Sequence, residues 1–298
     1  MTSKYPLDQT FTHKSATHDF QIHWTHIGDE TLPPLVFIHG TPWSSIVWED
    51  LVSSLCSRYH IYIYDHPGFG VSPSYRRTKD AVNADQIDLD GSLVLRAEAS
   101  AALFKHWNLP RRPHVVAHDN GGLVSMRLLL QHGNEFASLT LIDVVIVGPF
   151  GLPFFKLVAE NHGVFEAIPP HMSEGLVRAY VKSAAFKPIS KEIEDRLSSP
   201  WLANGSQGTS RFLQEMVQAH NRDVSDVEKD YAGVGIQTPV KIIWGADDAW
   251  LPVEIAGRLK TALNAQEMVL VDEAAHLIHY DQPSKLALEV GVWLGQHI

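Results

Sequence analysis

The sequence predicts an α/β fold with a mostly parallel central sheet and helices on both faces. Six short apolar segments, rich in β-branched and aromatic residues, alternate with segments whose apolar residues recur at helical spacing. Most of the short segments end at turn or polar residues, as strands buried on both faces of a sheet do. Strands and helices in this order imply parallel strands joined by right-handed crossovers.

Each expected element follows from its residue pattern. The strands are expected at residues 34–38, 60–64, 114–117, 139–142, 240–244 and 268–271. Helical spacing of apolar residues marks 93–104, 122–131 and 286–294. Residues 8–27 alternate between apolar and polar, which indicates an antiparallel hairpin at one edge of the sheet.

One region interrupts the alternation. Residues 147–235 show no buried strand pattern and are rich in helix formers. We expect a helical cap here, inserted ahead of the strands at 240–244 and 268–271, over a core formed by residues 1–146 and 236–298. Large apolar side chains in this cap indicate a small, mainly apolar organic substrate, although they can equally form the cap's own core. They are Phe150, Phe154, Phe155, Phe165, Trp201, Phe212 and Met216.

The composition narrows the range of functions. The 298 residues are 45% hydrophobic and 19% charged, which is ordinary for a globular protein. A net charge of −10 disfavours binding to nucleic acids or anionic membranes. The lone cysteine, Cys56, cannot form an internal disulfide, and no signal peptide or membrane-spanning segment is evident. We expect a cytoplasmic protein, as a monomer or homodimer.

The 17 histidines raise the question of a metal site. No HExxH motif or Cys/His pairing accompanies those of the N-terminal hairpin, so we expect no metal. The run Gly68-Phe69-Gly70 lacks the third glycine of a dinucleotide-binding fingerprint, so we expect no cofactor.

The segment at 117–122 carries the most informative pattern, because it follows an apolar strand and opens a helix. A sharp strand-to-helix turn requires small residues around its tip, and Ala117 and Gly121 occupy those places. Asp119 is the tip, where its side chain would stand above the sheet at a helix N-terminus. The plain alternative is that Asp119 only caps the helix.

A series of motifs, in the expected order, resembles the α/β-hydrolase fold superfamily. The branch it resembles has an aspartate nucleophile and contains epoxide hydrolases and haloalkane dehalogenases. The similarity covers roughly residues 20–145 and 236–298. The matching segments are His39-Gly40-Thr41-Pro42 (HGxP), 65–72 (DxPGxGxS), 118–122 (the nucleophile elbow), 245–252 (GxxDxxxP) and the histidine loop from His276 to Pro283.

The resemblance implies an Asp-His-Asp triad, and the chemistry of the residues agrees. The Asp119 carboxylate is ionised at neutral pH, and its attack on an sp³ carbon forms an alkyl ester. Hydrolysis of that ester needs a base, for which His276 is the candidate, and an acid to orient the imidazole, for which Asp248 is the candidate. The backbone N–H groups of Thr41 and Asn120 would hold the oxyanion.

Three residues compete for these roles. Asp247 stands beside Asp248, and Asp143 ends an earlier strand where some relatives place the acid. His279 lies three residues after His276. The spacing of the motifs favours Asp248 and His276, and a shared acid role for Asp143 stays open.

The leaving group decides the reaction. Opening an epoxide requires a proton donor, and the resemblance implies two cap tyrosines. The cap contains only Tyr180 and Tyr231, of which Tyr180 is the better placed, and His220 is a candidate second donor.

Displacing a halide requires N–H donors instead. Haloalkane dehalogenases usually carry asparagine in the first motif and tryptophan after the nucleophile, where this chain has Thr41 and Asn120. Trp43 is a partial substitute. We therefore expect epoxide hydrolysis to a diol, with water as co-substrate. The alternatives are haloalkane or haloacid dehalogenation, a lyase, isomerase or cyclase that uses Asp119 as a base, and a non-catalytic binding module.

Overall fold

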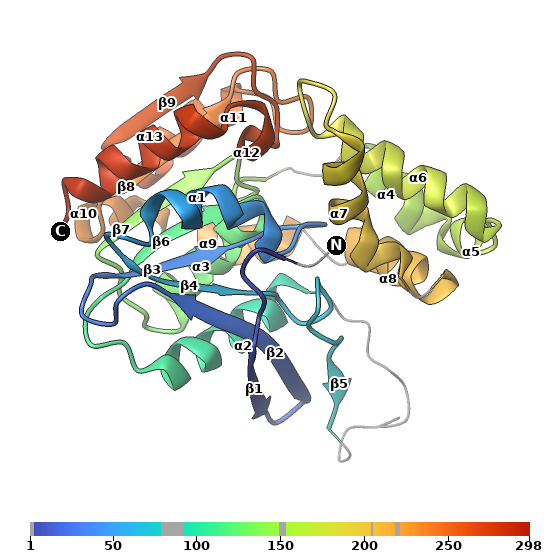
Figure 1. Cartoon of the computed structure of the whole chain (residues 1–298), viewed down its shortest axis with the longest axis horizontal. Coiled ribbons are helices and arrows are strands. Elements are labelled where there is room, and N and C mark those ends of the chain that lie inside the picture. Colours follow the sequence, from blue (N-terminus) through green and yellow to red (C-terminus); the bar gives the residue numbers. More distant parts are fainter. Residues whose placement is uncertain (1–2, 79–91, 149–152, 204, 218–220) are drawn as a thin grey trace.

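The computed structural model describes residues 3–78, 92–148, 153–203, 205–217 and 221–298. Within these ranges, nine strands form one sheet in the order β1-β2-β4-β3-β6-β7-β8-β9, with β5 paired to β2 (Figure 1). The strands are β1 (Gln9–Lys14), β2 (His18–Ile27), β3 (Pro34–Ile38), β4 (His60–Tyr64), β5 (Arg76–Arg77), β6 (His114–His118), β7 (Ser138–Ile142), β8 (Val240–Gly245) and β9 (Glu267–Val271).

The sheet is mostly parallel, as the sequence predicts. All five neighbouring pairs from β4 through β9 are parallel, and the β1–β2 hairpin adds antiparallel strands at the other edge. The expectation that residues 268–271 are buried on both faces is wrong. Among the described strands, β9 pairs with β8 alone and lies at the edge of the sheet. It is largely half-buried, and Leu270 on it is 44% exposed.

Helices cover both faces of the sheet. Neighbouring residues of β3 point to opposite sides, so that Val36 packs in one core cluster and Phe37 in the other. The core helices are α2 (Leu93–Trp107), α3 (Asn120–Gln131), α9 (Asn221–Glu228) and α11 (Glu254–Leu263) on the first side, and α1 (Glu49–Leu55) and α13 (Pro283–Gly295) on the second. Short turns complete the core: η1 (Ser45–Trp48), η2 (Tyr231–Gly233), α10 (Val234–Gln237) and α12 (Ile278–Asp281).

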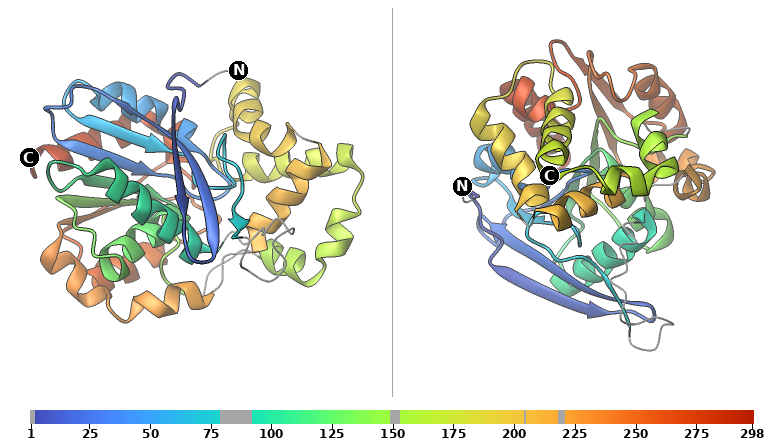
Figure 2. Two further views of the ribbon diagram at one scale, coloured as in Figure 1. Left: turned by 90° about the horizontal axis from the view of Figure 1, so that it is seen from below. Right: turned by 90° about the vertical axis from the view of Figure 1, so that its right-hand side faces the viewer.

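Between β7 and β8 the chain forms a group of helices at one end of the molecule (Figures 1 and 2). They are α4 (Pro153–Glu160), α5 (His162–Glu166), α6 (Pro170–Ser183), α7 (Lys191–Leu202) and α8 (Ser206–Val217). The helices that follow, α9 and α10, lie on the core instead, and α9 packs on α3. The division at 147–235 stays a prediction.

The large apolar side chains of the cap pack mainly on one another. Trp201, Phe212 and Met216 are buried in a single cluster with Tyr180, and the three half-buried phenylalanines Phe154, Phe155 and Phe165 pack against it. Phe150 lies outside the described residues. These side chains therefore form the core of the cap.

The cap rests on loops that follow strands of the sheet. The Trp201 indole N–H donates to the Pro42 carbonyl over 2.9 Å, and the Leu277 N–H donates to the Ala184 carbonyl over 2.9 Å. The loops after β3 and β9 thus lie beneath the cap. In the described part of the chain, no helix is both long and apolar enough to cross a membrane.

Candidate active site

The turn between β6 and α3 presents Asp119 in an unusual backbone conformation, with φ 51° and ψ −128°. Its side chain makes no capping hydrogen bond to α3. Two glycines make room for the turn: a Cβ on Gly121 would lie 2.4 Å from the Ile38 carbonyl oxygen, and one on Gly40 would lie 2.3 Å from Asp119 Oδ1. A strained residue that does not cap its own helix is typical of a functional position.

The Asp119 carboxylate lies between two donors. The Thr41 N–H donates to Oδ1 over 2.7 Å, and His276 Nε2 lies 3.4 Å from Oδ2. The Asn120 N–H, predicted as a second donor, makes no hydrogen bond to this carboxylate. As the first residue of α3, Asn120 also has no carbonyl partner for its N–H within that helix. The Thr41 N–H therefore contacts the carboxylate, and the donor role of the Asn120 N–H stays a prediction.

His276 is fully buried and contacts Asp248 on its other side, where Nδ1 lies 2.9 Å from Asp248 Oδ2. Because a carboxylate accepts and does not donate, the Nδ1–H is the donor. The Trp250 and Leu251 N–H groups hold the second oxygen of Asp248 at 2.7 and 3.0 Å. The three side chains Asp119, His276 and Asp248 thus form one connected line.

The charges around His276 set its protonation. Burial lowers the pKa of His276, but the Asp248 and Asp119 carboxylates and the hydrogen bonds to them outweigh burial and raise that pKa to about 10. At neutral pH the imidazole therefore carries a proton on each nitrogen and lies as a cation between two anions.

Replacing Asp248 with asparagine is expected to lower the pKa of His276. The Asp248→Asn variant removes the carboxylate that most strongly raises this pKa and keeps the size of the side chain. Histidine-selective NMR titration measures the shift. The matched control is Asp247→Asn, because the neighbouring Asp247 side chain is exposed. Equal pKa values for His276 in the two variants would contradict the assignment of Asp248.

The raised pKa of His276 also makes stability depend on pH. The folded protein holds a proton on His276 up to about pH 10, whereas an unfolded histidine loses it near 6.5. This contribution is therefore complete below pH 6.5 and is lost as the pH rises through 10. Urea unfolding across this range is expected to show a smaller pH-dependent loss in Asp248→Asn than in Asp247→Asn.

The competing residues Asp143 and His279 make different contacts. Asp143 is buried with φ 41°, and its Oδ1 accepts the Gly245 N–H over 2.8 Å. Burial, followed by the charge of Asp248, raises the pKa of Asp143 well above its usual range. The acid in contact with His276 is Asp248, and no hydrogen bond joins Asp143 to the ring. His279 is buried beside Trp48, with its ring centroid 4.8 Å away.

Two further histidines stabilise the loops that carry residues of the site. His39 Nε2 accepts the His66 N–H over 3.0 Å, and His39 Nδ1 donates to the Gly40 carbonyl over 2.9 Å. Burial lowers the pKa of His39 to about 4, so the ring is neutral. His118 Nε2 donates to the His276 carbonyl over 2.9 Å. These rings hold the loops that carry Gly40 and His276.

Trp43 and Trp250 lie beside His276, and Tyr180 packs on Trp250. The Trp250 ring lies between those of Tyr180 and His276, at centroid distances of 4.4 and 4.9 Å, and stacks on Trp43 at 6.0 Å. The Tyr180 hydroxyl and the Trp43 indole N–H are both buried without a hydrogen-bond partner among the described residues. The sequence predicts Tyr180 and Trp43 as residues that contact the leaving group. Trp250 was not predicted as a site residue, although it lies inside the 245–252 motif.

His220 and Tyr231 are the other two cap residues considered as proton donors. His220 lies outside the described residues. Tyr231 donates its hydroxyl to the Ile146 carbonyl over 2.8 Å and packs in the core, so it is structural.

Comparison with known proteins agrees with this geometry. The sequence pattern of the Alpha/beta hydrolase family matches residues 35–290. The chain belongs to this family. A crystal structure of an alpha/beta hydrolase fold protein from Burkholderia ambifaria is 31% identical, with a TM-score of 0.85, over 97% of this chain and 99% of that chain.

Other relatives of this alpha/beta hydrolase carry the names of different activities. Epoxide hydrolase 1 of Caenorhabditis elegans is 21% identical over 289 residues, which are 93% of this chain and 68% of that protein. The pimeloyl-acyl-carrier-protein methyl ester esterase of Aeromonas hydrophila is 34% identical over 110 residues, which are 37% of each chain. The family thus establishes a hydrolase but leaves the reaction to be decided by the site.

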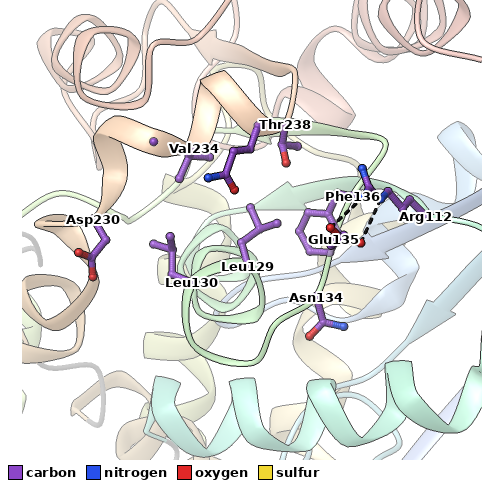
Figure 3. A pocket seen from close by; sticks show the side chains of 11 residues that line it. Arg112, Leu129, Leu130, Asn134, Glu135, Phe136, Asp230, Val234 and Thr238 are labelled. Atoms are coloured by element: carbon purple, nitrogen blue, oxygen red, sulfur yellow. Dashed lines mark hydrogen bonds and ion pairs between the residues drawn. The ribbon is translucent and has the colours of Figure 1, made fainter.

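A separate pocket of about 130 Å³ lies away from Asp119 (Figure 3). It is bordered by the end of α3 and by residues of η2 and α10, and the Arg112–Glu135 ion pair lies on one side. It contains none of the triad residues, so it plays no part in the chemistry proposed below.

Proposed function

We propose that this alpha/beta hydrolase cleaves a bond at an sp³ carbon of a small, mainly apolar organic substrate through a covalent ester on Asp119. The observation that carries the proposal is the position of the Asp119 carboxylate. It makes no capping hydrogen bond to α3 and lies between the Thr41 N–H and His276 Nε2. Epoxide hydrolysis to a diol fits the surrounding residues best. In this respect the chain would resemble its epoxide hydrolase relative.

The first step opens the epoxide. A carboxylate oxygen of Asp119 forms a bond to one ring carbon, the carbon–oxygen bond of the ring breaks, and the electron pair stays on the departing oxygen. Tyr180 supplies the proton to that oxygen. Burial, followed by the charges of Asp119 and Asp248, raises the pKa of Tyr180 well above its usual range, so the phenol is protonated before reaction.

Ester formation also changes the pKa of His276, which is the base of the second step. The charge of Asp119 helps to raise the pKa of His276, and esterification removes that charge. The pKa of His276 therefore falls only after the ester exists. The proton that the imidazolium then releases returns Tyr180 from the phenolate to the phenol. Esterification thus shifts His276 toward the neutral imidazole at the point where water must be activated.

The second step hydrolyses the ester. His276 takes a proton from water, the hydroxide adds to the Asp119 carboxyl carbon, and the Thr41 and Asn120 N–H groups stabilise the oxyanion. The acyl–oxygen bond breaks, the departing alkoxide takes the proton of the added hydroxyl and leaves as the diol, and Asp119 returns to a carboxylate that keeps one oxygen from the water. His276 returns to the imidazolium, stabilised by Asp248.

Dehalogenation is the second candidate, favoured by the indole N–H of Trp43, which has no hydrogen-bond partner in the part of the chain that the structure describes. A halide leaves with its electron pair and needs N–H donors instead of a proton. Ester cleavage, the activity of the esterase relative, is disfavoured because attack of Asp119 on an ester would form an anhydride.

Replacing Tyr180 with phenylalanine separates these reactions. Tyr180→Phe removes the proton donor, so the rate of ester formation with styrene oxide is expected to fall about 10²-fold. The rate with 1-bromohexane should not change. Rapid-quench intact mass spectrometry measures both rates. The matched control is Tyr231→Phe, which deletes a structural hydroxyl outside the site. An unchanged rate with styrene oxide in Tyr180→Phe would show that Tyr180 is not the proton donor.

A further inference from the structure

A buried arginine joins the cap to the turn that carries Thr41. Arg96, on α2, donates from Nη1 to Thr41 Oγ1 over 2.8 Å and from Nη2 to Glu215 Oε2 over 2.6 Å. The side chains of Arg96 and Glu215 are only 1% and 4% exposed. Thr41 belongs to the core and Glu215 to cap helix α8, so one guanidinium connects both parts.

The arrangement leaves the guanidinium little freedom. Its plane offers donors in a fixed fork, so two hydrogen bonds in different directions define its orientation. The Phe69 ring lies under it, with the centroid 4.4 Å from Cζ. Gly68 permits Glu215 to approach, because a Cβ there would lie 2.8 Å from Glu215 Oε1.

The fixed guanidinium in turn constrains Thr41. Arginine has no acceptor, so the Thr41 hydroxyl must accept from it, and this fixes the side-chain rotamer. The N–H of the same residue donates to Asp119 Oδ1 over 2.7 Å. The next residue, Pro42, accepts the indole N–H of Trp201 from α7. The cap therefore contacts this turn at two successive residues.

We propose that Arg96, held by Glu215 of the cap, is a positioning residue that keeps the Thr41 N–H directed at the Asp119 carboxylate. Docking of α8 and orientation of the oxyanion donor are then coupled. The inference rests on the proposed function in treating Thr41 as an oxyanion donor. A simple anchor for the cap would need the Arg96–Glu215 pair but not its contact with Thr41.

A second ion pair provides the matched control. Arg196 on α7 contacts both oxygens of Glu49 on α1, at 2.6 and 2.7 Å. This pair also ties the cap to the core, but it contacts neither Thr41 nor Asp119. Arg196→Lys therefore weakens an anchor of the cap without disturbing the turn.

The test compares Arg96→Lys, Thr41→Val and Thr41→Ser with Arg196→Lys. The rate of ester hydrolysis, the step in which Thr41 stabilises the oxyanion, is expected to fall about 10- to 100-fold in Arg96→Lys and Thr41→Val after reaction with saturating styrene oxide or 1-bromohexane. Thr41→Ser keeps the hydroxyl and should recover most of the rate that Thr41→Val loses, whereas Arg196→Lys, outside the site, should leave the rate unchanged. A double variant, Arg96→Met with Glu215→Met, replaces the first variant if Arg96→Lys does not fold.

Hydrogen exchange of the Thr41 amide, followed by NMR, gives a readout that needs no substrate. Faster exchange is expected in Arg96→Lys and Thr41→Val than in Arg196→Lys. If exchange and rate in Arg96→Lys match those in Arg196→Lys, the pair is only a cap anchor and the inference is overturned. If wild type forms no ester with either probe, the proposed function fails, while the exchange of the Thr41 amide still decides the positioning role.

Discussion

Replacing Asp119 with asparagine is expected to abolish turnover, with a loss of about 10⁶-fold, the scale seen when a triad nucleophile is removed. Asparagine has nearly the same shape but no charge, so it cannot form the ester. Turnover of styrene oxide and 1-bromohexane, together with intact mass, measures the effect. Asp247→Asn serves as the control, since it removes an exposed carboxylate near the site.

The same variant carries a second expectation about His276. Asp119→Asn removes one of the two charges that raise the pKa of His276, so this pKa should fall below about 10, as in the ester. A lowered pKa of His276 together with a loss of turnover would support Asp119 both as the nucleophile and as a charge that raises this pKa. Turnover within about 100-fold of wild type would show that Asp119 is not the nucleophile.

Replacing His276 with alanine is expected to trap the ester. The Asp119 carboxylate remains and still reacts, but no base activates water, so hydrolysis should slow by about 10⁶-fold while ester formation continues. Intact mass is expected to rise by the mass of the epoxide, or by the mass of the haloalkane less HX. Peptide mapping should place the added mass on Asp119.

His279→Ala is the control for this experiment. His279 is a buried imidazole three residues away and has no contact with Asp119 or Asp248. It should turn over substrate and accumulate no ester. An adduct on another residue of His276→Ala, or no adduct with either probe, would favour the alternatives in which Asp119 acts as a base or the site only binds.

The turn at Asp119 can be predicted from the sequence because its requirements are local. Small residues at Ala117 and Gly121 are needed wherever a strand bends directly into a helix, and the structure shows the close contact at Gly121. Most of the strands are equally predictable from their composition, but the two-residue strand β5 is not. The edge position of β9 is not, because it depends on which strand pairs with it.

The partner of His276 is harder to predict. Asp143, Asp247 and Asp248 all follow strands, and the spacing of a motif is the only signal that separates them. The structure distinguishes them by distance and burial: Asp248 lies 2.9 Å from the ring, and Asp247 is exposed. Side-chain direction at a turn depends on backbone angles that composition does not encode.

The contact between Arg96 and Glu215 has no local signal at all. The two residues are 119 positions apart, on a core helix and a cap helix. Helical spacing predicts that Arg96 lies on a helix, and an arginine is ordinarily exposed there. The packing of α8 over the core decides its burial, and this packing was not predictable.

The covalent cycle is tested most directly by one turnover in water labelled with ¹⁸O, with wild-type enzyme in excess over styrene oxide, or over 1-bromohexane if only the halide reacts. Water that attacks the ester carbonyl leaves its oxygen in the protein. The peptide that contains Asp119 should gain ¹⁸O, and the first diol or alcohol released should be unlabelled. Label in that first product, with none in Asp119, would mean that water attacks the substrate itself and would contradict the mechanism.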